Sequence, residues 1–397
     1  MERIIGTHAR SIRAPIISQG DDLEKITVDS VLEASRRDGF KLRDRDVIGI
    51  TESLLARSQG NYVEIDEIAE EAGELFPETF VVLFPILSRN RFSLILKGLA
   101  MSGKKVIVML SYPSDEVGNH LMDVDEMDKA GINPYTDVLR EADYRAHFGH
   151  SFTHPFTGLD YIDLYTGLAV HDNIEVVLAN DPLRALDYSK DVLVAHIHDR
   201  QRIKRKLLAQ GGRRIVGLDE FMCRPRRSGG YNPDYGLLGS NQAGETRLKL
   251  FPRGAEEFCR EVQRRLLEET GKTVEVMVYG DGAFKDPQGK IWELADPVVS
   301  PGFTDGLIGT PNEIKMKYVA DNELAGLPAA EAEKRLREII SSKETDLLGK
   351  NASLGTTPRQ LTDLLGTLCD LLSGSGDKGT PIIHIQGYFD NYASEST

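Results

Sequence analysis

The chain has 397 residues and a formal net charge of −14, with 40% hydrophobic and 28% charged residues. This composition is ordinary for a soluble protein of two or three domains, and its acidity argues against a protein that binds nucleic acid through the phosphates. Three widely separated cysteines provide no disulfide framework or paired metal motif, so we expect a reducing, cytoplasmic setting. The longest apolar run, 80–87, is too short to cross a bilayer, so we expect no membrane partner.

The first segment predicts a helix, a strand and a second helix. Asp21 and Asp22 are suited to cap a helix that runs to about Arg37 and ends at Asp38-Gly39. The short apolar run 47–51 predicts a strand, and 65–76 predicts an acidic amphipathic helix.

In the middle of the chain, apolar runs alternate with stretches that have the pattern of a helix. Apolar runs at 104–111, 174–179 and 192–198 predict buried strands, and 200–210 predicts one of the helices between or after them. Such alternation is typical of an α/β layer. The stretch 225–239, rich in Arg, Gly, Pro, Tyr and Asn, predicts a long loop at a functional segment or a domain junction.

The C-terminal part begins with a strand–helix–strand unit. The strands are predicted at 246–251 and 274–279, and the helix between them at 253–270. A further helix is predicted at 358–372 and a last strand at 381–386.

One candidate site lies at the end of the strand 274–279, where Gly280, Asp281 and Gly282 follow the apolar run. Ligands of α/β sheets gather at the carboxyl ends of strands, and a carboxylate there suits a hard cation that holds the phosphates of a nucleotide. Ser240 and Asn241 come directly after the long loop, where small residues allow backbone N–H groups to approach an anion. Arginines at positions 224, 226 and 227 add local positive charge.

A second candidate site is rich in histidine, because seven of the nine histidines lie between residues 76 and 230. Imidazole is a common ligand of zinc and other transition metals, so this region could also form a metal site. Two groups are close in sequence: His147, His150 and His154, and then His196 and His198 after a predicted strand. We expect His150, His154, His196 and His198 to line the face of this region that is turned toward the rest of the protein.

Three blocks of the sequence, in order, resemble the coenzyme F420-0:γ-glutamyl ligases. The first holds Gly20-Asp21-Asp22-Leu23 and the segment 51–63, and the second is 238–282, with Ser240-Asn241 before the strand–helix–strand unit. The segment 303–309 is similar to a stretch further downstream. The third block combines 346–350 with Gly379-Thr380-Pro381-Ile382-Ile383.

The resemblance implies a mixed α+β fold. Residues 1–75 and 231–397 would form a ligase-like α+β core, and residues 76–230 an inserted α/β region that is longer than the middle of the family. It further implies a cytoplasmic homodimer that joins L-glutamate to a small-molecule acceptor through an acyl phosphate. GTP would be the co-substrate and Mg²⁺ or Mn²⁺ the metal.

The resemblance and the chemistry of the residues together suggest roles. Asp281, which matches the family pattern, would hold the metal with the help of Asn241. From their charge and backbone access, Ser240, Asn241, Arg224, Arg227, Gly280 and Gly282 are expected to contact the nucleotide. The sequence departs from the family at Gly239, which stands where the family has a metal-binding aspartate, and at Gly282, which replaces a threonine or serine. Two alternatives stay open: a metal-dependent hydrolase that uses the histidines, and a relative without catalysis that binds a small anion.

Overall fold

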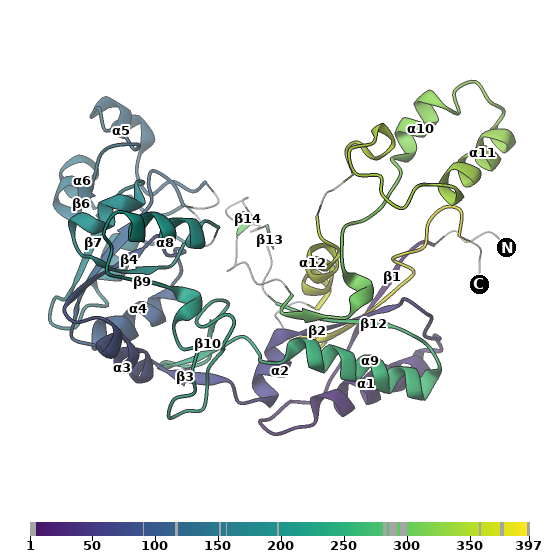
Figure 1. The fold of residues 1–397 in the computed structure, drawn as a ribbon, viewed down its shortest axis with the longest axis horizontal. Coiled ribbons are helices and arrows are strands. Elements are labelled where there is room, and N and C mark those ends of the chain that lie inside the picture. Colours follow the sequence, from purple (N-terminus) through teal and green to yellow (C-terminus); the bar gives the residue numbers. More distant parts are fainter. Residues whose placement is uncertain are drawn as a thin grey trace.

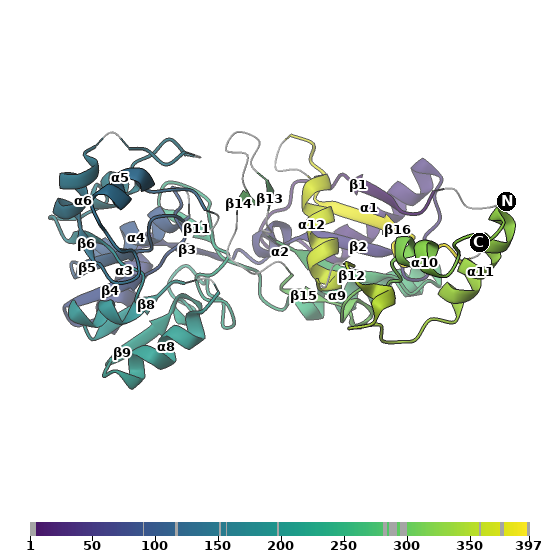
Figure 2. The same ribbon diagram turned by 90° about the horizontal axis from the view of Figure 1, so that it is seen from above.

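The computed structural model describes residues 5–89, 91–115, 118–150, 152–155, 157–196, 198–280, 284–285, 292–293, 300–356, 359–373 and 377–394. It shows a mixed α+β fold with two lobes side by side, each built on its own sheet (Figures 1 and 2). In the part of the chain that is described, no helix is both long and apolar enough to cross a membrane.

The first lobe contains a five-stranded sheet with helices on both faces. The strand order is β1 (His8–Ile12), β16 (Ile382–Gln386), β2 (Val47–Thr51), β12 (Glu275–Tyr279) and β15 (Gly302–Phe303). Helices α1 (Leu23–Asp38) and α9 (Ala255–Thr270) pack on one face with a shared apolar core. Helix α12 (Leu361–Ser373) covers the other face through Leu361, Leu365 and Cys369.

Helix α1 shows why the predicted ends were accurate. The Asp22 side chain accepts a hydrogen bond from the backbone N–H of Lys25, and Gly39 ends the helix with a φ of 70°. A side-chain oxygen at the start and a glycine in the left-handed region at the end satisfy backbone groups that the helix leaves unpaired.

The second lobe contains a six-stranded sheet in the order β6-β7-β5-β4-β8-β9. These strands are β4 (Thr79–Leu83), β5 (Lys105–Leu110), β6 (Leu139–Arg140), β7 (Ile174–Leu178), β8 (Asp191–Val194) and β9 (Arg214–Gly217). All neighbouring pairs are parallel except β6 with β7. Taken in chain order, the five parallel strands therefore lie 3-2-1-4-5, which is the order of a doubly wound sheet.

Both faces of this sheet are buried, which explains its continuous apolar strands. Alternate residues such as Phe80 and Val82 face α3 (Ile65–Leu75) and α4 (Phe92–Met101), and Val81 and Leu83 lie in the core with α8 (Arg200–Ala209). The remaining helices of the lobe are α5 (Val124–Lys129), α6 (Glu141–Phe148), α7 (Tyr161–Thr166) and the 3₁₀ turns η1 (Pro182–Asp187) and η2 (Leu218–Glu220).

A small sheet, β10-β11-β3, lies where the chain passes between the lobes. Its strands are β3 (Tyr62–Glu64), β10 (Asn241–Gln242) and β11 (Arg247–Lys249). Val63, Ile68 and Phe76, together with Leu248 and Phe251, belong to the core of the second lobe. That core therefore extends beyond the boundaries predicted at residues 75 and 230.

The remaining elements complete the description. Helix α2 (Glu52–Ser58) directly follows β2, and β13 (Phe284–Lys285) pairs with β14 (Trp292–Glu293). Helices α10 (Met316–Asn322) and α11 (Ala329–Ser341), with η3 (Asp305–Leu307) and η4 (Asn351–Ser353), form an arm on the first lobe (Figure 1). The sequence patterns did not predict this arm or the edge strand β1.

Candidate functional site at the ends of β2 and β12

The candidate site begins where two neighbouring parallel strands end. In the register of β2 and β12, Thr51 is paired with Tyr279, so the next residues, Glu52 and Gly280, leave the sheet side by side. A Cβ atom placed on Gly280 would lie 3.1 Å from Cγ of Glu52. This is the edge of an α/β sheet at which ligands usually bind.

The ring of Phe251 brings a third segment to this edge. A Cβ atom on Gly239 would lie 2.0 Å from Cε2 of Phe251, and one on Gly280 would lie 2.7 Å from Cζ of the same ring. Both glycines therefore contact one buried aromatic side chain, and no larger residue fits at either position without movement. Gly239 stands where the resembling family has an aspartate, and here the space for such a side chain is filled by Phe251.

The hairpin of β10 and β11 adds a buried ion pair. Asn241 is paired with Lys249 across the hairpin, and Lys249 Nζ lies 2.9 Å from Oε1 of Glu52 and 2.7 Å from Oγ of Ser53. Lys249 is 8% exposed and Glu52 4% exposed. Since a buried charge needs a partner, this pair joins the hairpin to the end of β2.

Ser240 carries a buried hydroxyl for which the described part of the chain offers no partner. The residue is 1% exposed, and its Oγ has no hydrogen-bond partner among the described residues. An unpaired buried hydroxyl costs about 1–3 kcal/mol, and buried polar groups are nearly always paired. Ser240 directly precedes Asn241, which is paired with Lys249, so this hydroxyl lies next to the hairpin that forms the site.

A network of amide side chains holds Phe251 in place. Nδ2 of Asn61 donates to the carbonyl oxygen of Phe251 at 2.6 Å, and Nδ2 of Asn232 donates to the same oxygen at 3.0 Å. Gln59 exchanges two hydrogen bonds with the backbone of Arg253. The turn after α2 and the long loop thus both support the ring on which the site is built.

The structure brings together three of the residues proposed from the sequence. Ser240 and Asn241 lie with Gly280 around Phe251 and the Lys249–Glu52 pair. Asp281 and Gly282 lie outside the described residues, so their roles in metal and nucleotide binding stay predictions.

The arginines of the long loop do not lie next to Asn241. Oγ of Ser228 donates to the carbonyl oxygen of Tyr62 on the outer edge of β3, whereas Asn241 lies on β10 at the opposite edge of the same small sheet. Arg226 pairs with Glu71 and Glu74, and Arg227 with Asp66 and Glu70, all on α3. These contacts fix the loop to α3 rather than bringing Arg227 to Asn241; Arg224 is exposed.

The histidines of the second lobe occupy different environments. His154 is buried and its Nε2 lies 2.9 Å from Oδ2 of Asp115, whose carboxylate also accepts hydrogen bonds from Asn119. His150 and His198 are exposed, and His196 is half-buried. Across the described ranges, no three His, Cys, Asp or Glu side chains form a group that could hold a metal.

Two residues of the site were not predicted from the sequence, Glu52 and Lys249. Glu52 could have been found, because it directly follows an apolar strand, the same signal that pointed to Asp281. The sequence around Lys249 did not point to a buried site residue, since a lysine in an alternating strand is usually exposed. Only the pairing of β11 with β10 and the position of α2 make it a buried neighbour of Glu52.

The chemistry of the site can be compared with what a divalent metal requires. Asn241, Glu52, Ser53 and Ser240 offer amide, carboxylate and hydroxyl oxygens, which are the donors that Mg²⁺ and Mn²⁺ prefer. Mg²⁺ usually needs only one or two protein carboxylates, with water and phosphate oxygens as its other ligands. These donor types suit a hard cation bound together with a nucleotide, and in the structure Glu52 Oε1 and Ser53 Oγ contact the Lys249 ammonium group.

A strand-end site with buried polar side chains lies where proteins with α/β sheets usually bind their ligands. The chain belongs to the F420-0:gamma-glutamyl ligase family, whose model matches residues 11–387. The match includes the whole second lobe as well as the first. The protein is therefore a member of a family of γ-glutamyl ligases of the coenzyme F420 type.

Other comparisons add little to this assignment. None of the curated proteins compared with the chain matches it. Among solved structures, the biosynthetic arginine decarboxylase of Campylobacter jejuni is 10% identical, with 89% of this chain and 66% of that chain covered. The TM-score of that match is 0.15.

Proposed function

We propose that the protein is a GTP- and divalent-metal-dependent γ-glutamyl ligase that forms an amide through an acyl phosphate. The observation that carries the proposal is the site around Phe251, found in a chain that belongs to the ligase family. There, an unpaired buried hydroxyl, an amide and a buried lysine lie beside the ends of β2 and β12.

The proposed reaction has two steps. An acceptor carboxylate takes the terminal phosphoryl group of GTP, and GDP leaves. The amine of L-glutamate then attacks the acyl carbon, the amide bond forms, and phosphate and a proton are released. Because amide formation from a free carboxylate is unfavourable in water, the protein must mainly position the reactants and neutralise charge.

The chain's own residues can perform these tasks. The backbone N–H group of Gly280 would bind a phosphate oxygen, since a glycine allows close approach to the backbone. Ser240 Oγ would donate its hydrogen bond to the nucleotide, and Lys249 would supply positive charge next to it. Glu52, Asn241 and, from the family resemblance, Asp281 would hold the metal. The metal, when bound, neutralises phosphate oxygens.

The first prediction separates a ligand-binding role of Ser240 from a structural one. Ser240→Ala removes a hydroxyl without a described partner, so we expect the free protein to be equally stable or slightly more stable. The same substitution should weaken Mn²⁺-dependent GTP binding by about tenfold, since a hydrogen bond to a charged group is worth about 1.5–3 kcal/mol. Thermal shift with and without GTP and Mn²⁺ measures both effects.

Thr27→Val is the matched control for this experiment. Thr27 is fully buried in α1 and its Oγ1 also has no partner among the described residues, but it lies in the core of the first lobe away from Phe251. It should change stability in the same direction as Ser240→Ala and leave GTP binding unchanged. Equal GTP binding in both variants would remove Ser240 from the site.

We further propose that the acceptor contacts the second lobe at the point between β4 and β8 where the strand order reverses. Doubly wound sheets bind ligands in this crevice. His196 follows β8, and its ring lies 5.9 Å from that of Phe84, which follows β4 with a φ of 52°. Nδ1 of His196 accepts hydrogen bonds from the backbone N–H groups of His198 and Asp199, which leaves Nε2 as the donor in the neutral ring.

His196 also gives a prediction about pH. Burial, first, and the nearby His198 lower the pKa of His196 below its ordinary value. Below a pH of about 6.5, His196 is protonated more readily in the unfolded chain than in the folded one. The contribution of the neutral His196 to the stability of the folded protein is therefore complete above this pH and decreases as the pH falls through it. Nitrogen-detected NMR titration should show the low pKa, and His196→Asn should remove this part of the pH dependence of unfolding.

The same variant tests the acceptor site. His196→Asn should raise the KM for the family's acceptor, coenzyme F420-0, and leave the KM for GTP unchanged. If the NMR titration shows the low pKa but the KM for both substrates is unchanged, His196 does not contact the acceptor and only shapes the turn before α8.

A further inference from the structure

The described chain passes between the two lobes twice. Leu55 belongs to the core of the first lobe and Val63 to the core of the second, so the first crossing lies between them. The return crossing lies between Phe251, in the second core, and Ala255, in the first. Close packing between described helices and strands occurs within each lobe or the small sheet, and none of it joins the layers of the two large sheets. The orientation of the lobes therefore depends on contacts at these crossings.

The two crossings are hydrogen-bonded to each other. The backbone N–H of Leu250 donates to the carbonyl oxygen of Asn61 at 2.9 Å, and Nδ2 of Asn61 donates to that of Phe251 at 2.6 Å. At the end of α2, Nε2 of Gln59 donates to the carbonyl oxygen of Arg253 at 2.6 Å, and Oε1 of Gln59 accepts from the N–H of Arg253 at 2.9 Å. The backbone of Arg253 is thereby bound to α2, which belongs to the first lobe.

The side chain of Arg253 contacts the second lobe. Its guanidinium lies over the ring of Tyr231, 4.5 Å from the centre, and Nη1 donates to the carbonyl oxygen of Tyr231 at 3.2 Å. Nη1 also donates to Oδ1 of Asn61, which accepts a further hydrogen bond from the N–H of Tyr231. The next residue of this loop, Asn232, donates its N–H to the carbonyl oxygen of Met222 in the core of the second lobe. Arg253 thus has its backbone bound to one lobe and its side chain to the other.

The charge of Arg253 is not balanced by a carboxylate. Among the described residues Arg253 forms no ion pair, and the partners of its side chain are two neutral oxygens and one face of an aromatic ring. A guanidinium group is planar, so it can stack on a ring and donate to several acceptors in fixed directions at the same time. These contacts are therefore suited to fix an orientation rather than to neutralise a negative charge.

The orientation of the lobes matters for the proposed reaction. There, the nucleotide is bound at the ends of β2 and β12 in the first lobe, and the acceptor at the ends of β4 and β8 in the second. The acceptor carboxylate and the phosphoryl group that it attacks are then held by different lobes. A displacement of about 1 Å between reacting groups can lower a rate about 100-fold.

We propose that Arg253 is a positioning residue, which fixes the orientation of the second lobe relative to the first and so holds the acceptor against the nucleotide. The inference rests on the proposed function for the two reactants. Arg253 acts through Tyr231 and Asn61 and touches neither reactant itself.

The test combines single-molecule energy transfer between the lobes with ligase kinetics. Dyes are attached at Leu208→Cys on α8 and Leu267→Cys on α9, two exposed positions, in a Cys223→Ser background in which the two remaining cysteines are buried. Arg253→Met removes the guanidinium and keeps most of the side-chain stem. It is compared with the wild type and with Arg10→Met.

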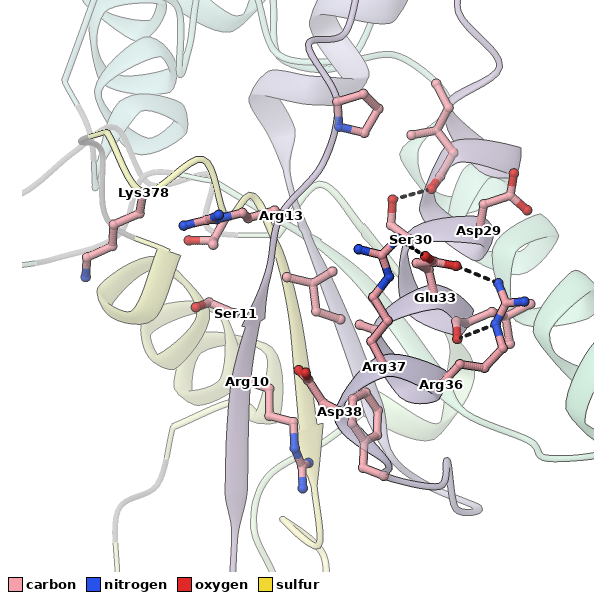
Figure 3. A pocket seen from close by; sticks show the side chains of 17 residues that line it. Arg10, Ser11, Arg13, Asp29, Ser30, Glu33, Arg36, Arg37, Asp38 and Lys378 are labelled. Carbon is pink, nitrogen blue, oxygen red and sulfur yellow. Dashed lines mark hydrogen bonds and ion pairs between the residues drawn. The ribbon is translucent and has the colours of Figure 1, made fainter.

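Arg10 is a matched control, because its contacts lie within the first lobe. It belongs to β1 (Figure 3), its guanidinium lies over the ring of Phe40, 4.6 Å from the centre, and its Nη1 lies 3.4 Å from Nδ1 of His384. Both arginines are half-buried, and each substitution removes a charge, a ring contact and hydrogen bonding. Arg10→Met should keep the wild-type distribution of distances between the lobes and the wild-type kcat.

Arg253→Met should broaden the distribution of distances between the lobes and lower kcat about 10- to 100-fold. The KM for GTP should stay unchanged, since Asn61 and Asn232 still hold Phe251 in this variant. Arg253→Lys should recover part of both losses, because an ammonium group can still donate to one of the two oxygens but cannot lie flat on the ring.

Two outcomes would overturn the inference: a wild-type distribution of distances in Arg253→Met, or a broadened distribution with wild-type kcat. If Arg253→Met does not fold, Tyr231→Leu takes its place with the same expected results, because it removes the ring and keeps the backbone hydrogen bonds. A failure of the proposed function gives a different result. The wild type then shows no GTP-dependent ligation while Arg253→Met still broadens the distribution, so the function fails and the orienting role of Arg253 stands.

Discussion

Lys249→Met should lower the free energy of unfolding by about 3–5 kcal/mol, the usual cost of removing one partner of a buried ion pair. Glu52 is 4% exposed, and its carboxylate would lose the ammonium group that now lies 2.9 Å away. The methionine keeps most of the volume of the lysine stem, so the charge is the main change. Urea unfolding followed by circular dichroism measures the loss.

Two further variants make this test specific. Arg227→Met also removes a cation that is paired with two acidic residues, but the Arg227 side chain is 61% exposed, so the expected loss of stability is much smaller. Glu52→Gln/Lys249→Met removes both charges and should recover most of the stability lost in Lys249→Met. If Lys249→Met were no more harmful than Arg227→Met, the pair would not be buried in solution.

The double variant also separates stability from binding. A protein that has regained its stability but lacks both charges should still fail to bind GTP with Mn²⁺, because Lys249 and Glu52 are proposed parts of the site. Wild-type GTP affinity in Glu52→Gln/Lys249→Met would mean that the pair only joins the hairpin to α2.

Gly239→Ala is expected to have the second large effect, because its new methyl group would lie 2.0 Å from Cε2 of Phe251. Gly239 also has a φ of 67°, which costs other residues about 1–2 kcal/mol, and overpacking adds about 1–3 kcal/mol. The displaced ring would move Gly280 and Asn241, so GTP binding should be lost together with stability. Urea unfolding and titration with GTP and Mn²⁺ measure the two effects.

Gly271→Ala is a close control, since Gly271 has the same φ of 67°, and no described atom lies within 4 Å of the place that its new methyl group would take. It should show the backbone cost alone and bind GTP normally. Gly239→Ala/Phe251→Leu should recover part of the stability, because the smaller side chain relieves the contact. Similar losses in Gly239→Ala and Gly271→Ala would contradict the packing of Phe251 between the two glycines 239 and 280.

These variants concern the feature by which this chain departs from the ligases that it resembles. An aspartate at position 239 would need the space that the Phe251 ring fills, so the two positions are coupled. Glu52 places a carboxylate in the same cluster from a different strand end. In the proposed function, the metal would then rely on Glu52, Asn241 and the predicted ligand Asp281.

Much of the local structure followed from the sequence because its causes are local. The helices α1, α9 and α12 carry an apolar stripe at helical spacing, and α1 and α9 end at a glycine, so their existence was predicted and confirmed. The strands β2, β5, β7 and β12 were predicted from short apolar runs for the same reason. The strand β1 and the helices α10 and α11 were not predicted. The reason is that β1 is a half-exposed edge strand and that the two helices bury few residues.

The sequence by itself predicted a mixed α+β fold, and it predicted that Ser240, Asn241 and Gly280 stand in or beside turns where backbone groups approach an anion. Only the tertiary structure decided that these turns meet, because their meeting depends on Phe251 packing between glycines that are 41 positions apart in the chain. It also decided that Lys249 is a buried partner of Glu52 and that Arg227 is engaged with α3. Long-range packing and charge pairing of this kind depend on which strands become neighbours, and no local pattern of residues specifies that.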